Sequence, residues 1–127
     1  MTAARDIVLI GAGGHGAVVA EAARAAGLKV TCAYDDDPEA ALPGVRRAGT
    51  LAAFAAAPAP WILAIGDLAA RRRALDRLAE IESPAPVVAH PSAIVSATAQ
   101  IGAGVLVSAG VIINARAKID SHAIINT

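Results

Sequence analysis

Aromatic side chains are almost absent from this sequence of 127 residues, which has one Trp, one Tyr and one Phe. A row of aromatic rings that stack on nucleic-acid bases is therefore excluded. An excess of charge of one sign is also lacking, since 11 basic and 11 acidic residues give a net charge of zero. Without a basic stripe, we expect no nucleic-acid partner.

Long apolar runs and paired cysteines are missing as well. Although 56% of the residues are hydrophobic, many of these are alanine, and no run approaches the ~20 residues of a membrane-spanning helix. The N-terminus lacks the pattern of a signal peptide. Cys32 is the only cysteine, so no internal disulfide can form, and we interpret it as a structural thiol in a buried strand. These absences predict a cytoplasmic protein without membrane insertion.

What the sequence does have is a repeat of six residues from position 93 to its last residue. β-Branched residues recur at this spacing, and small residues stand two places before them. The two sets are Val95, Ile101, Val107, Ile113, Ile119 and Ile125, and Ala93, Ala99, Val105, Val111, Ala117 and Ala123. Strands have a period of two and helices a period of 3.6, so neither alone explains a period of six. The repeat predicts a triangular coil of short strands with the branched residues inside. An ordinary β-solenoid or a set of sandwich strands is the alternative.

The preceding residues show another pattern, in which apolar strands alternate with helices. We expect strands at 6–10, 29–34, 61–65 and 87–89, helices from the glycine-rich segment to about 26, at 51–57 and at 68–81, and a loop at 39–50. Such alternation predicts a small doubly wound parallel sheet. The fold class is therefore α/β, with a Rossmann-like domain at 1–89 followed by the first coils of a β-helix at 90–127, which is expected to be incomplete.

A glycine-rich loop follows the first strand and opens the first helix. Gly11, Gly13 and Gly16 fit the pattern G-x-G-x-x-G, in which glycines permit a tight turn and helix N–H groups attract phosphate oxygens. Asp35 and Asp36 follow the second strand, where an acid can bind a ribose hydroxyl. A nucleotide-sugar diphosphate site, an NAD site and a purely structural turn all fit this loop. The six-residue repeat, which is foreign to dehydrogenases, favours the first.

Several motifs in chain order resemble the bacterial sialic-acid O-acetyltransferase-like family, which includes UDP-4-amino-sugar N-acetyltransferases. The matching segments are Gly11-Ala12-Gly13-Gly14-His15-Gly16 with Val18, Val19 and Glu21, the pair Asp35-Asp36, Ile65-Gly66-Asp67, His90-Pro91-Ser92-Ala93 and Ile124-Ile125-Asn126-Thr127. The resemblance covers the whole chain. It implies that the coil is a left-handed parallel β-helix of the hexapeptide-repeat acyltransferases, whose hand departs from the usual crossover rule.

The resemblance also implies a reaction, the transfer of an acetyl group from acetyl-CoA to the amine or hydroxyl of a nucleotide-activated sugar. The implied substrate-binding residues are Gly11, Gly13, Gly14, His15, Gly16, Asp35, Asp36, Gly66 and Asp67. Asn126 matches the family's active-site asparagine, and acetyl-CoA is expected to bind between the subunits of a homotrimer formed through the β-helix.

The family's general base, a histidine, lies in a segment that would follow Thr127. We therefore expect a truncated chain that lacks the base and most of the acetyl-CoA site. A non-catalytic nucleotide-sugar-binding fragment is the second hypothesis, and an NAD-binding Rossmann domain is the third.

The remaining histidines and charged residues are interpreted as structural. We expect His90 to make a capping hydrogen bond and His122 to lie at an outer face or corner of the coil, on the surface or between subunits. The three histidines lack metal-ligand spacing, and we predict no metal site. The arginines 71–73 occupy consecutive helix positions that point in different directions, so we interpret them as a solvated face.

Overall fold

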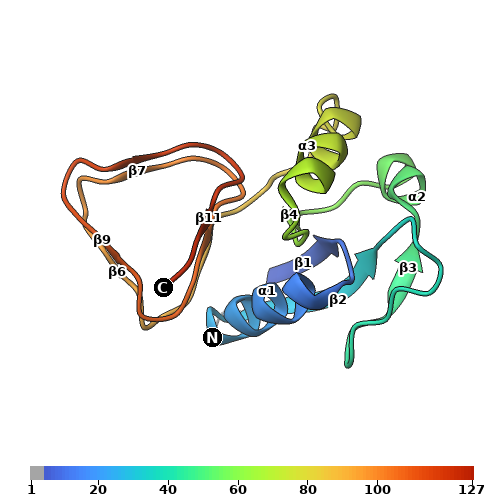
Figure 1. Cartoon of the computed structure of the whole chain (residues 1–127), viewed down its shortest axis with the longest axis horizontal. Coiled ribbons are helices and arrows are strands. Elements are labelled where there is room, and N and C mark those ends of the chain that lie inside the picture. Colours follow the sequence, from blue (N-terminus) through green and yellow to red (C-terminus); the bar gives the residue numbers. More distant parts are fainter. Residues whose placement is uncertain (1–4) are drawn as a thin grey trace.

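A four-stranded parallel sheet forms the N-terminal part of the molecule (Figure 1). The computed structural model describes residues 5–127, so the first four positions of the predicted N-terminal domain lie outside the described residues. The strands are β1 (Arg5–Ile10), β2 (Leu28–Tyr34), β3 (Arg47–Gly49) and β4 (Trp61–Leu63), in the order β3-β2-β1-β4. The central strand β1 is a nearly continuous apolar run, as a strand buried on both faces requires.

Helices cover both faces of this sheet. Because side chains of a strand alternate between faces, Ile7 and Leu9 pack with α1 (Gly14–Ala25) on one side, whereas Val8 and Ile10 point to the other. There they pack against α2 (Leu51–Ala56) and α3 (Leu68–Arg77). The doubly wound arrangement predicted from the alternation of strands and helices is confirmed. Cys32 is buried in β2, as expected of a structural thiol.

Two strand assignments differ from the sequence prediction. Residues 47–49, expected to be part of a loop, form the edge strand β3, which is held by the Arg47 guanidinium donating to the Asp35 carbonyl at 2.7 and 3.0 Å. Residues 87–89 were expected to add a strand to this sheet, and that is wrong. Instead β5 (Val88–Ala89) pairs with the later strand β8 (Leu106–Val107), after the prolines at 84 and 86 have carried the chain away from the sheet.

The C-terminal part winds as a triangular coil of short parallel strands (Figure 1). Its remaining strands are β6 (Ile94–Val95), β7 (Gln100–Ile101), β9 (Ile112–Ile113), β10 (Lys118–Ile119) and β11 (Ile124–Ile125). Each strand pairs with the strand three repeats away, so that β6 pairs with β9, β7 with β10, and β8 with β11. The fold class predicted from sequence is confirmed. The division at residue 89/90 stays a prediction, although parallel pairing along the coil already begins at Val88.

The two periodic residue sets fill the inside of this coil, as the repeat predicts. Val105, Val107, Val111 and Ile113 are buried, and most of the other members of both sets pack against them. The corners also follow the repeat, because residues 104, 110, 116 and 122 all have left-handed backbone, with φ of +67°, +75°, +66° and +62°. Two of these four are glycines, the residue type that adopts this conformation at the lowest cost.

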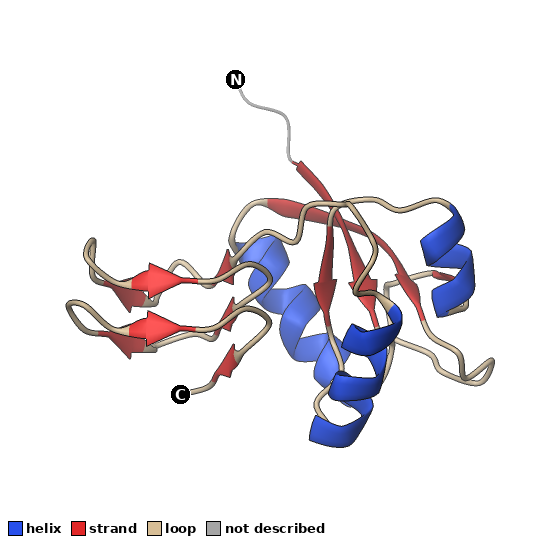
Figure 2. Cartoon of the chain, turned by 90° about the horizontal axis from the view of Figure 1, so that it is seen from above, coloured by secondary structure: helices blue, strands red, loops and turns tan. Residues whose placement is uncertain are grey.

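The coil lies against helix α1 (Figure 2). Val88 and Leu106 belong to the same buried cluster as Val19 and Ala22 of α1, and Ile124 packs against it. One apolar core therefore joins the sheet, α1 and one wall of the coil. Within residues 5–127, no helix is long and apolar enough to cross a membrane.

Candidate functional site

The carboxyl ends of the parallel strands meet the predicted loop residues at one edge of the sheet. Gly11 follows β1, Asp35 follows β2, and the segment from Ile65 to Asp67 lies just beyond β4. The chain leaves β1 toward β2 on one side and later returns as β4 on the other side. This reversal creates a crevice at the strand ends, which is where open α/β sheets bind ligands.

A cavity of about 370 Å³ opens at this edge. It is lined by Gly11, Asp35, Asp36, Leu51, Ile65, Ala70, Arg73, Ala74 and Arg77. The structure thus brings Gly11, Asp35 and Asp36 together, as the sequence predicts for a nucleotide site. The cavity is within the size range of small-ligand sites. The other predicted loop residues, and Asn126, do not line it.

Each glycine of the loop has a different environment. Gly11 is buried at φ +113°, where an added Cβ would lie 2.7 Å from Ile65 Cγ1. Gly16 is packed against Leu42. Gly13 and Gly14 are exposed at the start of α1. Among the described residues, their added Cβ atoms would meet nothing within 4 Å, and no side chain caps the helix. Gly11 and Gly16 therefore shape the loop, whereas Gly13 and Gly14 leave the helix N-terminus open to an anion.

The acidic residues of the site hold its backbone in place. Asp35 accepts hydrogen bonds from the backbone N–H groups of Ala12 and Asp37, each at 2.9 Å. Asp67 caps α3 by accepting from Ala70 N at 2.9 Å. The segment from Ile65 to Asp67 also brings Gly66 under the first turn of α1, where an added Cβ would lie 3.3 Å from the His15 Cβ. Asp35 thus ties the end of β2 to the glycine loop.

Asp36 links three elements at the rim of the cavity. Its carboxylate accepts from the backbone N–H of Leu51 at 2.9 Å and forms an ion pair with Arg77. The Leu51 hydrogen bond, followed by Arg77, holds the pKa of the Asp36 carboxyl below its usual value. Because both interactions favour the ionised form, the carboxylate joins β2, α2 and α3.

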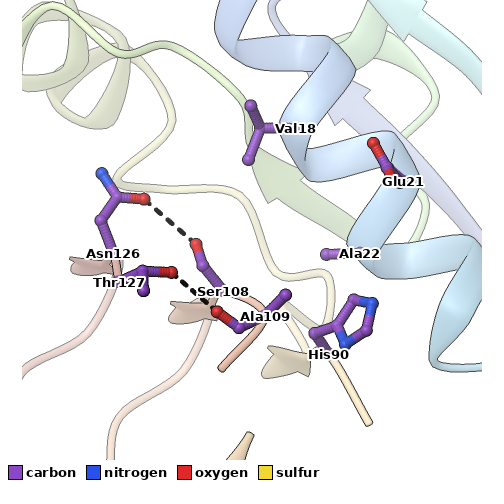
Figure 3. Close-up of a pocket in the computed structure, with 8 residues that line it drawn as sticks. All are labelled: Val18, Glu21, Ala22, His90, Ser108, Ala109, Asn126 and Thr127. Atoms are coloured by element: carbon purple, nitrogen blue, oxygen red, sulfur yellow. Dashed lines mark hydrogen bonds between the residues drawn. The ribbon is translucent and has the colours of Figure 1, made fainter. Parts of the chain in front are cut away.

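Asn126 lies in a second cavity, of about 290 Å³, between α1 and the coil (Figure 3). Ser108 Oγ donates to Asn126 Oδ1 at 3.1 Å, and the amide nitrogen points away from Ser108 (Figure 3). The cavity is lined by Val18, Glu21, Ala22, His90, Ser108, Ala109, Asn126 and Thr127. The Ser108 hydrogen bond orients the amide so that its NH₂ group is free to donate.

Sequence reasoning missed several of these lining residues. Arg73 and Arg77 stand four apart on α3, a spacing that places two side chains on one face, and both line the first cavity. The interpretation of arginines 71–73 as a solvated face is wrong for Arg71, which is 7% exposed. Consecutive arginines do diverge, but the coil packs over the direction in which Arg71 points. Glu21 belongs with the glycine loop to the segment that resembles the family, whereas Ser108 carried no motif signal.

The three histidines have different roles. His90 forms the predicted capping interaction, with Ser92 N donating to its Nδ1 at 3.0 Å. His122 is at a corner of the coil, as predicted, but it is half-buried against Trp61 and does not lie on an open surface. Its expected place between subunits stays a prediction. Its ring stacks on Trp61, with ring centroids 5.1 Å apart and ring planes at 20° to each other, because the coil corner packs against the edge strand β4.

His15 and His122 share a partly buried environment next to Arg71. His15 Nε2 and His122 Nδ1 are shielded from solvent and have no hydrogen-bond partner among residues 5–127. Burial, and secondly the positive charge of Arg71, lower the pKa of both imidazoles below the ordinary value of 6.5. Near neutral pH, both rings are therefore uncharged in the folded chain.

This environment predicts a loss of stability in mild acid. As the pH falls below 6.5, the unfolded chain takes up protons at these histidines before the folded chain does. The free energy of unfolding should therefore decrease from about neutral pH until the folded pKa values are passed. Thermal unfolding followed by circular dichroism at a series of pH values measures this. A His15→Asn/His122→Asn double variant should have a flatter profile, and an equally steep one would contradict the assignment.

No group of three or more His, Cys, Asp or Glu side chains within the described range is arranged to hold a metal ion. The acidic run at 35–37 instead forms turns, since Asp35 accepts from Asp37 N and Asp37 from Glu39 N, each at 2.9 Å. Short local hydrogen bonds of this kind are typical of Asp in turns.

Comparisons with known proteins give consistent results. Residues 6–78 match the family described as PglD N-terminal domain. The structure is similar to PerB from Caulobacter crescentus in complex with CoA and GDP-perosamine, with 37% identity and a TM-score of 0.85 over 96% of this chain. It is also similar to the acetyltransferase domain of PglB from Neisseria gonorrhoeae in complex with acetyl coenzyme A, with 33% identity and a TM-score of 0.87 over 98% of this chain. No curated protein sequence gives a significant match.

The chain spans 60% of the length of PerB and 62% of the PglB domain. A third similar structure is a mutant perosamine N-acetyltransferase from Caulobacter crescentus, again in complex with CoA and GDP-perosamine. It has 38% identity, a TM-score of 0.86 and the same coverage of 96% of this chain and 60% of its own. Both parts of the fold are thus found together in these acetyltransferases.

Proposed function

Because the chain belongs to the PglD N-terminal domain family, we propose that it binds a nucleotide-activated amino sugar and serves its acetylation by acetyl-CoA. The observation that carries this proposal is the cavity lined by Gly11, Asp35 and Asp36 at the strand ends, in a chain that continues directly into a coil of six-residue repeats. Identity above 30% to proteins whose structures contain CoA or acetyl-CoA supports it.

The two cavities suggest separate tasks. In the proposal, the cavity beside Asp36 and Arg73 holds the nucleoside end, and the open N-terminus of α1 at Gly13 and Gly14 takes the diphosphate. The sugar then extends past His15 toward the coil. The α1–coil cavity with Asn126 is the proposed place for the reacting end of the sugar.

Acetyl transfer from a thioester to an amine passes through a tetrahedral oxyanion. Preorganised N–H donors stabilise such charge and typically account for about 10²–10³ in rate per donor. The Asn126 amide suits this task, since Ser108 fixes its carbonyl oxygen and leaves the NH₂ group to donate. A general base would have to remove the proton of the attacking amine. His15 and His122 are kept neutral near this path, but neither lines the Asn126 cavity.

A homotrimer packed through the coil is part of the same proposal. Ile94 and Ile112 face outward as register partners on β6 and β9, and each is 65% exposed. An apolar pair on a coil wall is a feature that a neighbouring subunit would cover. Sedimentation equilibrium that finds only monomers would contradict this part of the proposal.

Calorimetry tests the substrate class directly. We expect UDP or GDP, and the corresponding 4-amino-sugar nucleotide, to bind to the chain with a measurable heat. NAD serves as the competing ligand because the glycine pattern alone also fits a dinucleotide. Tight NAD binding without any response to UDP or GDP would overturn the proposal and favour an NAD-binding domain.

Gly13→Val is the matching variant for this experiment. Its backbone, at φ −90° and ψ −164°, is an extended conformation that valine adopts readily, and the position faces open space. The fold should therefore remain, as judged by circular dichroism. The branched side chain would occupy the proposed phosphate position, and nucleotide affinity should fall at least about tenfold, or 1.4 kcal/mol. Unchanged affinity would mean that the loop serves only as a turn.

A further inference from the structure

Arg71 is a buried cation without an acidic partner in the part of the chain that the structure describes. Its side chain is 7% exposed, and the one ion pair recorded among residues 5–127 joins Arg77 to Asp36. The Arg71 guanidinium instead donates to two backbone carbonyls, that of Ile65 at 2.7 Å and that of His122. A buried charge is costly unless it is well hydrogen-bonded, so this arrangement needs an explanation beyond stability.

The two carbonyls belong to different parts of the molecule. Ile65 lines the proposed nucleotide cavity and directly precedes Gly66 and Asp67. His122 is the coil corner that leads, four residues later, to Asn126. A single planar guanidinium therefore joins the edge of the nucleotide cavity to the coil segment that carries the amide of the proposed reaction site.

The surroundings of Arg71 hold this link in a defined geometry. Trp61, at the start of β4, stacks on the ring of His122, and Trp61 Nε1 donates to the Ser83 carbonyl at 3.2 Å. His15 of the glycine loop lies over Gly66 and is close enough to Arg71 for that charge to lower its pKa. Arg71 thus connects three segments. It hydrogen-bonds to Ile65 just beyond β4 and to His122 of the coil, and its charge acts on His15 of the glycine loop.

We infer that Arg71 is a positioning residue, which sets the separation between the nucleotide cavity and Asn126 by binding Ile65 and His122 together. This inference rests on the proposed function. The apolar contact of α1 with Val88 and Leu106 already joins the two parts on another side, so loss of Arg71 would shift the coil corner without detaching the coil. Misplacement of a reacting group by 1 Å can cost about 10²-fold in rate.

The variant Arg71→Met tests the inference, with Arg71→Lys as the conservative change. Arg72→Met is the matched control, since Arg72 is exposed on the same helix and carries the same charge. Trp61 is the only tryptophan, so its fluorescence reports on its stack with His122. In Arg71→Met, acrylamide quenching of Trp61 should rise at least about twofold, as expected for local opening. Arg71→Lys should restore part of the protection, and Arg72→Met should match the unaltered chain.

Ligand binding separates positioning from general stability. For Arg71→Met, the affinity for UDP or GDP should stay within about twofold of that of the unaltered chain. The ratio of the affinity for the 4-amino-sugar nucleotide to that for the free diphosphate should fall at least about fivefold. Unchanged Trp61 quenching, or an equal loss of affinity for the diphosphate and the sugar nucleotide, would overturn the inference. If the unaltered chain binds no nucleotide, the proposed function fails, and the quenching experiment still decides whether Arg71 holds the coil corner.

Discussion

Gly11→Val should destabilise the chain more than any other single change in the glycine loop. Gly11 has φ +113°, and a Cβ there would lie 2.7 Å from Ile65 Cγ1 and 2.9 Å from the Ala64 carbonyl oxygen. Backbone strain of this kind costs about 1–3 kcal/mol. Forced overpacking costs a further 1–3 kcal/mol, roughly. The expected loss, about 2–6 kcal/mol, is a large part of the stability of an ordinary domain.

Urea denaturation followed by circular dichroism measures this loss. Gly14→Ala is the control, since it lies in the same loop but at the first position of α1, where an added Cβ meets nothing within 4 Å. Alanine is a better helix former than glycine, so this control should be neutral or slightly stabilising. Equal effects of the two substitutions would show that the close contact with Ala64 and Ile65 does not determine the loop structure.

Gly104→Ala is the second change with a large expected effect. The Cβ would lie 2.3 Å from His122 Nδ1, and residue 104 has φ +67°. His122 cannot move freely, because its imidazole ring stacks on Trp61 and its backbone carbonyl accepts a hydrogen bond from Arg71. The coil corner, Trp61 and Arg71 must therefore rearrange together, at a cost of about 1–3 kcal/mol beyond the backbone strain.

Gly110→Ala provides a closely matched control for this experiment. It is one repeat later, at the equivalent position of the next corner, with φ +75°, and its added Cβ would meet nothing within 4 Å among the described residues. Both substitutions therefore share the cost of about 1–2 kcal/mol for a left-handed alanine. The difference between the two unfolding free energies isolates the contact with His122. A difference near zero would mean that the corner of residue 122 adapts without cost.

Together, these substitutions distinguish two kinds of contribution to the proposed site. Gly11 and Gly104 fix the shape of the loop and of the coil corner, so their replacement should impair folding. Gly13 is in an unstrained, open position, so its replacement should impair ligand binding alone. Arg71 belongs to neither class, since its expected effect is on how the two parts are placed relative to each other.

The sequence alone was sufficient for the features that repeat or that depend on neighbouring residues. The β-branched and small residues at a spacing of six predict the coil and its interior, because each residue of a repeat meets the same surroundings in every coil. The glycine loop between an apolar run and a helix predicts the strand–loop–helix unit, because local backbone freedom decides it. The doubly wound sheet follows from the alternation of elements.

Only the tertiary structure decided the features that depend on residues far apart in the chain. Val88 joins the coil because its partner strand begins at residue 106, and no local pattern distinguishes it from a strand of the sheet. Arg71 is buried, and His122 stacks on Trp61, because the coil packs back onto the end of the sheet. Burial and hydrogen-bond partners are set by which distant surfaces meet, and for these residues that information exists only in the folded chain.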